Sequence, residues 1–365
     1  MLTSLKLLST INKKLTWNKA RLKCTVSLIR SLIKNRTVNL VIASTCMTDQ
    51  TKKESEYRKA QRFFEKFEMP LLEIGMFILT SLSKPKKGWT LAMDRTNWKF
   101  GNTHINILTL GVVIKGIAIP VVWKVLPQKT KRGNSNTAQR IEILKDLFQI
   151  MPASSIYALT MDREFIGKTW LEWLDAQGVP FIVRIKKSHQ VNGVGAAKYR
   201  QQQKLKSSEK VGIWGLNLYF GAKAIQRGRD SHLYVISNRF EAKEALKIYK
   251  QRWAIELLFS HLKKRGFNLE STHMTEGAKI ERLFGIVTLS FFATYSWGII
   301  LSMTTNLTVS EKRKSIFRLG LESLMELFDK REGSPPSDDI PIESHLSLEQ
   351  SYYVISMVNS KPETA

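Results

Sequence analysis

The sequence contains very little cysteine. Only Cys24 and Cys46 occur among its 365 residues, and neither belongs to a CxxC motif or to a cluster of cysteine and histidine. This scarcity argues against a disulfide framework and against a structural zinc site, and it fits a reducing cytoplasm. The N-terminal stretch also lacks the long apolar core and the small-residue cleavage site of a signal peptide. We therefore expect a cytoplasmic protein.

Acidic side chains are scarce as well. Aspartate and glutamate total 31 against 57 lysines and arginines, which gives a formal net charge of +26. A charge of this size repels itself in a compact chain, so we expect an anionic partner. Nucleic acid is favoured, because basic proteins that neutralise phosphates release counterions. An anionic membrane surface and a merely basic soluble protein are the alternatives.

Long apolar runs are almost absent. One uncharged run, 284–303, has the length of about 20 residues that spans a bilayer. It contains serine, threonine and glycine, and no second run accompanies it. We therefore favour a fully buried core helix over a membrane span. The hydrophobic content of 43%, with 17 Phe and 9 Trp, is sufficient for a sizeable core.

The composition and the hydrophobic pattern of the sequence change several times along the chain, and these changes divide it into parts. Basic amphipathic helices come first, then strands mixed with helices, a glycine-punctuated stretch, further helices and a polar end. This order predicts an α/β protein rather than a bundle or a sandwich. The expected parts are a helical DNA-binding region at 1–82, a mixed-sheet core at 83–187 and 241–305, a β-rich insertion at 188–240, and a C-terminal helix at 306–365 with a flexible tail around 332–339.

Two aspartates follow apolar runs in the same local context. We expect one strand to end at Asp94, in "AMDRTNW", and another to end at Asp162, in "TMDREF". Between them the pattern predicts a hairpin that turns at Lys115 and Gly116. A charge at the end of a buried strand is costly unless it is paired, binds metal or points into a cleft. Each aspartate alone is more simply a turn residue, but the repeated pattern indicates a common role.

A later helix carries four polar residues along one face. They are Tyr249, Arg252, Glu256 and Lys263. At about 100° per residue of a regular α-helix, the four fall within a stripe about 60° wide. The alternative is a solvated face whose Arg252–Glu256 ion pair contributes about 0.3 kcal/mol.

Glu256 and the two aspartates together have the ligand chemistry of a two-metal site. Mg²⁺ takes oxygen ligands and commonly combines a few carboxylates with substrate phosphate. Two such ions about 4 Å apart can activate an attacking oxygen and stabilise the leaving one. Arg252 and Lys263 can hold phosphate oxygens. Arg184 and Lys186, on the strand "FIVRIKK", are either further DNA contacts or a solvated strand end.

These residues resemble a known family. The spacing Y-x2-R-x3-E-x6-K is similar to the signature of bacterial insertion-sequence DDE transposases of the family-four (YREK) type. "MDRTNWKFG" and "MDREF" resemble the two aspartate blocks of that family. "RGNSNTAQRIEIL" and "FRLGLESL" resemble other segments, so the resemblance covers nearly the whole chain. It implies a ribonuclease H-like catalytic core and cut-and-paste transposition through a hairpin intermediate.

The resemblance also implies roles and partners. The implied ligands of two Mg²⁺ ions, with Mn²⁺ as a substitute, are Asp94, Asp162 and Glu256. The implied contacts to the 5′ phosphate of the transposon end are Tyr249, Arg252 and Lys263, and Trp214 in the β-rich insertion is a candidate platform for a flipped base. The implied partners are double-stranded DNA, at terminal inverted repeats and at the target, and a second copy in a homodimer. No membrane is involved.

Two other classes of function stay open. A decayed or domesticated transposase would bind DNA without catalysis. A nuclease or junction resolvase on the same fold would cut DNA without joining strands.

Overall fold

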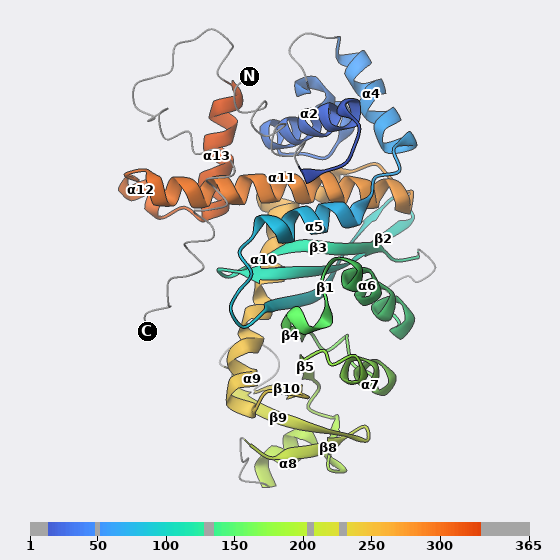
Figure 1. Ribbon diagram of the computed structural model, residues 1–365, viewed down its shortest axis with the longest axis vertical. Coiled ribbons are helices and arrows are strands. Elements are labelled where there is room, and N and C mark those ends of the chain that lie inside the picture. The colour runs from blue at the N-terminus through green and yellow to red at the C-terminus, as the bar shows by residue number, and fades with distance from the viewer. Residues whose placement is uncertain (1–13, 48–51, 128–134, 203–207, 226–231, 330–365) are drawn as a thin grey trace. The chain divides into compact units, whose positions relative to one another are not determined.

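The computed structural model describes residues 14–47, 52–127, 135–202, 208–225 and 232–329 (Figure 1). The tail predicted around 332–339 lies outside the described residues. The chain forms two compact units. The sheet unit comprises Pro85–Trp98 and His104–Leu258. The helical unit comprises Met1–Lys84, Lys99–Thr103 and Phe259–Ala365.

The sheet unit is built on one mixed sheet of eight strands. The strands are β1 Trp89–Phe100, β2 Thr103–Ile114, β3 Ile117–Val125, β4 Ile156–Met161, β5 Phe181–Ile185, β8 Lys210–Ile213, β9 Leu216–Ala224 and β10 His232–Ser237. Their order in the sheet is β3-β2-β1-β4-β5-β10-β9-β8. β4 pairs in parallel with both β1 and β5, whereas β10 pairs antiparallel with β5 and β9. The predicted α/β fold with a mixed sheet is confirmed.

The central strand β1 is longer than expected. Its parallel pairing with β4 ends at Met93 and Met161, and its run of buried residues ends there too. The strand predicted to end at Asp94 nevertheless continues to Phe100, so that prediction is wrong. β1 lies between β4 and β2, and β2 has 12 residues like β1, so the ladder to β2 extends β1 beyond the end of β4.

The predicted hairpin after β1 is confirmed. β2 and β3 pair antiparallel up to Ile114 and Ile117, and Lys115 and Gly116 form the turn with φ of 46° and 80°. Two consecutive residues with positive φ are the signature of a type I′ turn, whose twist matches the twist of the paired strands. Farther along the chain, the β-rich stretch supplies β8, β9 and β10, which extend the same sheet, and a ribbon of β6 Gln190–Val191 and β7 Val194–Gly195.

Helices accompany the sheet at several points. They are α6 Thr137–Ile150, α7 Lys168–Ala176, α8 Ala196–Gln202, α9 Ala242–Tyr249 and α10 Trp253–Ser260. A capping box between Asn136 and Gln139 fixes the start of α6, because each side chain accepts a hydrogen bond from the other's backbone N–H. α9 packs its apolar side against β4, β5 and β10, where Ile248 and Tyr249 join Ile182 and Val235 in one buried cluster.

The helical unit is centred on one long helix. Its helices are α2 Lys19–Asn35, α3 Leu40–Ala43, α4 Lys53–Lys66, α5 Leu71–Ser81, α11 Gly277–Thr304, α12 Val309–Lys312 and α13 Ile316–Asp329. α11 packs against α2, α4, α5 and α13 (Figure 1). In the part of the chain that the structure describes, α11 alone is long and apolar enough to cross a membrane, but 89% of its apolar window is buried. The prediction of a buried core helix is confirmed.

Close packing explains two glycines of the helical unit. A Cβ atom at Gly298 of α11 would overlap the carbonyl oxygen of Ile316, and one at Gly320 of α13 would overlap that of Thr294. The backbones of α11 and α13 therefore approach one another more closely than any larger residue allows. In place of the single C-terminal helix expected within 306–365, the described residues of this region form two helices, α12 and α13, after the end of α11.

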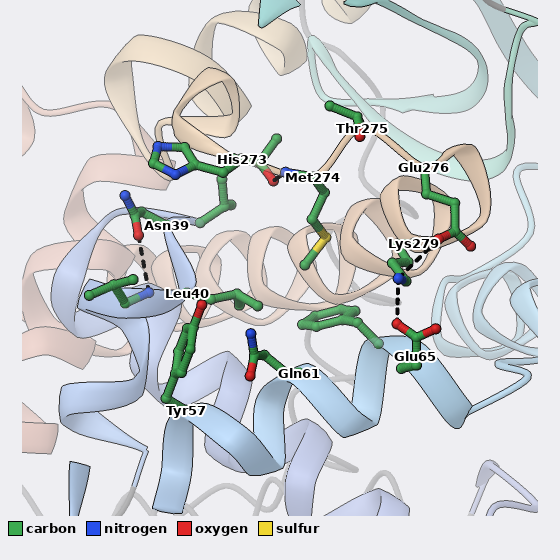
Figure 2. A pocket seen from close by; sticks show the side chains of 14 residues that line it. Asn39, Leu40, Tyr57, Gln61, Glu65, His273, Met274, Thr275, Glu276 and Lys279 are labelled. Atoms are coloured by element: carbon green, nitrogen blue, oxygen red, sulfur yellow. Dashed lines mark hydrogen bonds and ion pairs between the residues drawn. The ribbon is translucent and has the colours of Figure 1, made fainter. Parts of the chain in front are cut away.

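The helical unit also holds a pocket of about 340 Å³ between α4 and the segment 272–276 (Figure 2). Tyr57, Gln61 and His273 line it, and Lys279 lies at one end. The Lys279 ammonium pairs with the carboxylates of Glu65 and Glu276, as the dashed lines in Figure 2 show. None of the predicted site residues lines this pocket, and its two carboxylates share the one Lys279 ammonium.

Candidate active site

Adjacent parallel strands bring Asp94 and Asp162 together. Met93 and Met161 are partners in the pairing of β1 with β4, and each aspartate is the next residue along its strand. Asp162 is close enough to raise the pKa of Asp94 by repulsion. The repeated Asp-Arg context thus corresponds to neighbouring positions where the pairing of β1 with β4 ends. The sequence around either aspartate alone does not show this.

Asp94 lies in a largely dry environment. Its side chain is 18% exposed, and burial raises the pKa of its carboxyl group to about 6. The carboxylates of Glu164 and Asp162 act in the same direction. The Arg95 backbone N–H donates a hydrogen bond to Asp94 Oδ1 over 2.7 Å and, with the Arg252 guanidinium, lowers that pKa in part. A cation placed here would stabilise the ionised carboxylate.

Arg252 joins carboxylates from two elements. Its Nη1 lies 3.3 Å from Asp94 Oδ2 in β1, and its Nη2 donates to Glu256 Oε1 one helical turn along. The i,i+4 ion pair considered from the sequence is therefore present, but Arg252 is only 8% exposed and the pair is no solvated stripe. Burial alone would lower the pKa of Arg252, yet the carboxylates of Glu256 and Asp162 raise it well above its ordinary value.

The ring of Tyr249 lies near the Arg252 guanidinium. The Arg252 guanidinium carbon lies 5.8 Å from the centroid of the Tyr249 ring, which suits a cation–π contact. Tyr249 is 6% exposed, and burial raises the pKa of its phenol far above the usual value, so the phenol stays neutral. Its hydroxyl is buried and has no hydrogen-bond partner among the described residues. Arg184 of β5 is near enough for its charge to act on Tyr249.

The helix that carries the four signature residues is not uniform. A 3₁₀ turn, Lys250–Arg252, joins α9 to α10, and a π-helical turn, His261–Arg265, follows α10. The face predicted with about 100° per residue therefore applies only to part of the segment. Lys263 lies in the π-helical turn, within the helical unit, and pairs with Glu270 over 2.7 Å.

The remaining sequence candidates have varied surroundings. Lys186 is exposed just after β5, and its backbone N–H donates to His189 Nδ1 over 3.2 Å. Trp214 is half-buried in the turn between β8 and β9, with a φ of 51°. Its ring meets His189 edge-on, with centroids 5.3 Å apart.

Two features of the site were not foreseen from the sequence. Trp253, directly after Arg252, is 57% exposed, an unusual position for an indole ring. Arg95 binds Glu164 with both ends of its fork, Nε to Oε1 and Nη2 to Oε2, each over 3.2 Å. The second feature had a signal in the sequence, because Arg95 and Glu164 belong to the triplets "DRT" and "DRE" that begin with the two aspartates.

The three carboxylates are suitable ligands for a divalent cation, although the Arg252 guanidinium binds two of them in this structure. Among the residues that the structure describes, no group of three or more His, Cys, Asp or Glu side chains is arranged to hold a metal ion. Arg252 binds both Asp94 and Glu256. Asp162 Oδ1, however, is buried without a hydrogen-bond partner in the described chain, a costly state that a cation would relieve. Carboxylate oxygens are the ligands that Mg²⁺ prefers.

Comparisons with known proteins identify the family. A search of curated proteins finds no match. Among solved structures, Endonuclease V from Bacillus subtilis is similar at 13% identity, and the match covers 58% of this chain and 92% of that chain. The TM-score of 0.29 is too low for a conclusion about the fold or the function. Residues 81–292, more than half of the chain, match the family model described as "Transposase DDE domain". This match includes both aspartates, Glu256 and the eight-stranded sheet, which is consistent with a ribonuclease H-like catalytic core. DDE domains process nucleic acid, bind DNA and generally depend on divalent metal ions. The chain belongs to the DDE transposase family.

Proposed function

We propose that this chain is a cut-and-paste transposase of the family-four (YREK) type, with Asp94, Asp162 and Glu256 as its metal ligands. The observation that carries the proposal is the linkage of these carboxylates: β1 and β4 place the aspartates side by side, and Arg252 ties Asp94 to Glu256. A site with three carboxylates and one buried guanidinium suits phosphodiester chemistry, which needs cation ligands and a phosphate contact together.

The side chains divide the work between holding cations and holding DNA. When bound, two Mg²⁺ ions, or Mn²⁺ in their place, supply an activated attacking oxygen and a stabilised leaving oxygen. The Arg252 guanidinium leaves Asp94 and Glu256 and binds a phosphate of the DNA end instead. DNA binding thereby frees these two carboxylates to bind the metal ions. Tyr249 stacks under this guanidinium, and Lys263, Arg184 and Lys186 add positive charge toward the DNA backbone.

The reaction is a series of displacements at phosphorus. Water attacks the phosphodiester at the end of the element and releases a 3′-OH. That hydroxyl attacks the opposite strand, which closes the end into a hairpin and releases the flanking DNA. After the hairpin is opened by a second water, the same 3′-OH attacks target DNA. Each step exchanges one P–O bond for another, so positioning and charge stabilisation supply the catalysis.

DNA recognition is distributed over both units in this proposal. The helical region at 1–82 grips the inverted repeat, as its basic α2 and α4 suit a phosphate backbone. Trp214 is a candidate platform for a flipped base. Trp253 is a second one, because its exposed indole follows Arg252 directly and can stack on an unpaired base. The partners are duplex DNA and a second copy of the chain in the cytoplasm.

The test uses DNA fragments that carry one of the inverted repeats flanking the reading frame together with the DNA that adjoins it outside the element. With Mg²⁺, the wild-type chain should cleave these fragments and yield closed hairpin ends, visible as single strands of double length on a denaturing gel. The Glu256→Ala variant should bind the fragments and leave them uncut. Cleavage by Glu256→Ala at the wild-type rate contradicts the proposal. Cutting without joining would indicate a nuclease, and binding without cutting a DNA-binding derivative.

A further inference from the structure

Arg140 is a buried cation outside the proposed ligand set. It lies in the first turn of α6, is 5% exposed, and directs its guanidinium toward backbone oxygens and the Ser135 hydroxyl. Its Nη2 donates to the carbonyl oxygen of Glu164 over 2.9 Å, and its Nη1 donates to that of Ile166 over 3.2 Å. Its Nε donates to the Ser135 hydroxyl over 3.0 Å, and Nη2 also donates to the Ser135 carbonyl oxygen. One side chain thus ties the start of α6 to the segment 162–167.

The segment 162–167 connects the second aspartate to α7. The Phe165 backbone N–H donates to the Asp162 carbonyl oxygen over 3.0 Å, which closes a tight turn directly after β4. The Phe165 side chain is fully buried, and the Arg140 guanidinium carbon lies 5.2 Å from the centroid of its ring. The carboxylate of Glu164 accepts two hydrogen bonds from the guanidinium of Arg95, the residue after Asp94. Both aspartates are therefore connected to one fastened segment.

Stability alone is a poor reason to bury this arginine. Removing a guanidinium from water is costly, and well-packed apolar residues replace buried ion pairs with little loss or with a gain. The pKa of Arg140 is lowered by burial, in agreement with that cost. The guanidinium does, however, offer a planar set of five donors, and that is what several acceptors on two backbone segments require. A lysine ammonium on a flexible stem would not fix them together.

We propose that Arg140 is a positioning residue: by fastening residues 164–166 to the start of α6, it sets the place of Asp162 beside Asp94. The Arg95–Glu164 pair completes the same clamp from β1. Arg140 itself touches no reacting atom, and its effect passes through the backbone of the turn. This inference rests on the proposed role of Asp162 as a metal ligand, and partners of ligands commonly change metal affinity or activity by about 10- to 100-fold.

The experiment compares Arg140→Met with a matched control, Asn238→Ala. Met keeps the length of the side chain and removes every donor. Asn238 donates to Asp175 Oδ1 over 2.9 Å and to the Val179 carbonyl oxygen over 3.1 Å, and it accepts from the Phe181 N–H over 2.8 Å. It thus fastens the start of β5, at the opposite ends of the parallel strands from Asp162. Ser135→Ala, which removes one acceptor of the clamp, serves where Arg140→Met fails to fold.

Three readouts separate positioning from general stability. Both Arg140→Met and Asn238→Ala should lower the Tm. Only Arg140→Met should raise amide hydrogen exchange in a peptide covering 162–167 by tenfold or more, and only it should weaken Mn²⁺ binding, measured by calorimetry without DNA, by about 10- to 100-fold. In end cleavage, kcat should fall by a similar factor while KM for DNA stays within about twofold. Ser135→Ala should show the same pattern with smaller changes.

One outcome would contradict the positioning role of Arg140. If Arg140→Met lowers the Tm as Asn238→Ala does but leaves exchange at 162–167 and Mn²⁺ affinity at wild-type values, Arg140 has only a structural role. If the wild-type chain itself neither binds Mn²⁺ nor cleaves DNA ends, the proposed function fails instead. Hydrogen exchange at 162–167 still decides in that case whether Arg140 fixes the turn.

Discussion

Each unit buries a cluster that contains an ionisable side chain, and the two side chains differ in charge. In the sheet unit, Arg252 is buried as a cation against the carboxylates of Asp94 and Glu256. In the helical unit, His261 is buried against Phe317, with ring centroids 4.4 Å apart, and burial lowers its pKa to about 4. His261 is therefore neutral, as a core favours, whereas the sheet unit retains charges that are costly to bury. Under the proposed function, the contrast separates groups kept for packing from groups kept for chemistry.

The contrast predicts its largest effect at the carboxylates. Asp94→Asn and Asp162→Asn should each reduce Mg²⁺-dependent end cleavage by about a thousandfold, since several kcal/mol of transition-state stabilisation are lost. Asp162→Asn should not lower the Tm, because the amide keeps the shape of the side chain and Asp162 Oδ1 has no hydrogen-bond partner among the described residues. Asp94→Asn should lower the Tm, because it removes one of the two carboxylates that offset the buried Arg252 guanidinium. The measurements are initial cleavage rates and thermal unfolding of the same preparations. A loss of activity that always accompanies a lower Tm would place these aspartates with the packing groups.

Arg252 gives the next largest effect, this time on stability. Arg252→Met leaves Asp94 without its cation, and we expect the free energy of unfolding to fall by about 2–3 kcal/mol. Added Mn²⁺ should restore part of this loss, because it binds the released carboxylates. The matched control is Arg318→Met, which breaks an i,i+4 pair with Glu322 in which the arginine is 68% exposed. That control should change stability by less than about 0.5 kcal/mol. Equal effects of the two substitutions would remove the distinction between the clusters.

The sequence predicted the framework of the site well, for identifiable reasons. Apolar runs and turn residues act over short distances, so the hairpin at Lys115 and Gly116 and the buried helix α11 were both predicted correctly. The repeated "MDR" around Asp94 and Asp162 indicated a shared role before the pairing of β1 with β4 was known.

What the sequence could not give depends on partners distant in the chain. β1 passes Asp94 because β2 is long enough to pair with it, and no local signal records that length. The angular pattern of Tyr249 to Lys263 assumed a regular α-helix, whereas the 3₁₀ and π-helical turns arise from packing. Arg140 has the sequence context of an ordinary arginine on an amphipathic helix, because two of its acceptors, the carbonyl oxygens of Glu164 and Ile166, lie 24 and 26 residues away.

The neutral cluster of the helical unit predicts a pH dependence. In the unfolded chain His261 has a pKa of about 6.5, and in the folded chain a pKa of about 4. The unfolded state therefore takes up the proton first, so the contribution to stability is fully present above about pH 6.5 and is lost as the pH falls toward 4. The loss should reach about 2–3 kcal/mol at pH 4.

His261→Phe is the variant that checks this dependence. Phenylalanine can keep the ring contacts with Phe317 and Phe291 but has no titrating group. Urea unfolding at pH 7.5 and pH 4.5 should show a smaller loss of stability on acidification for the variant than for the wild type. An identical loss in both proteins would show that His261 is not the neutral core group described above.

The smallest effect concerns the exposed indole beside the charged cluster. Trp253→Ala should weaken binding of DNA ends by about 1–2 kcal/mol, roughly tenfold in Kd, because one base loses its stacking partner. Stability should stay within about 0.5 kcal/mol, since Trp253 is 57% exposed and buries little apolar surface. Trp214→Ala is the comparison, because that ring already contacts His189. Fluorescence anisotropy with fragments that carry an unpaired base at the terminal position measures both variants. If only Trp214→Ala weakens binding, base stacking belongs to the β8–β9 turn, and the surface beside Arg252 recognises the DNA by charge alone.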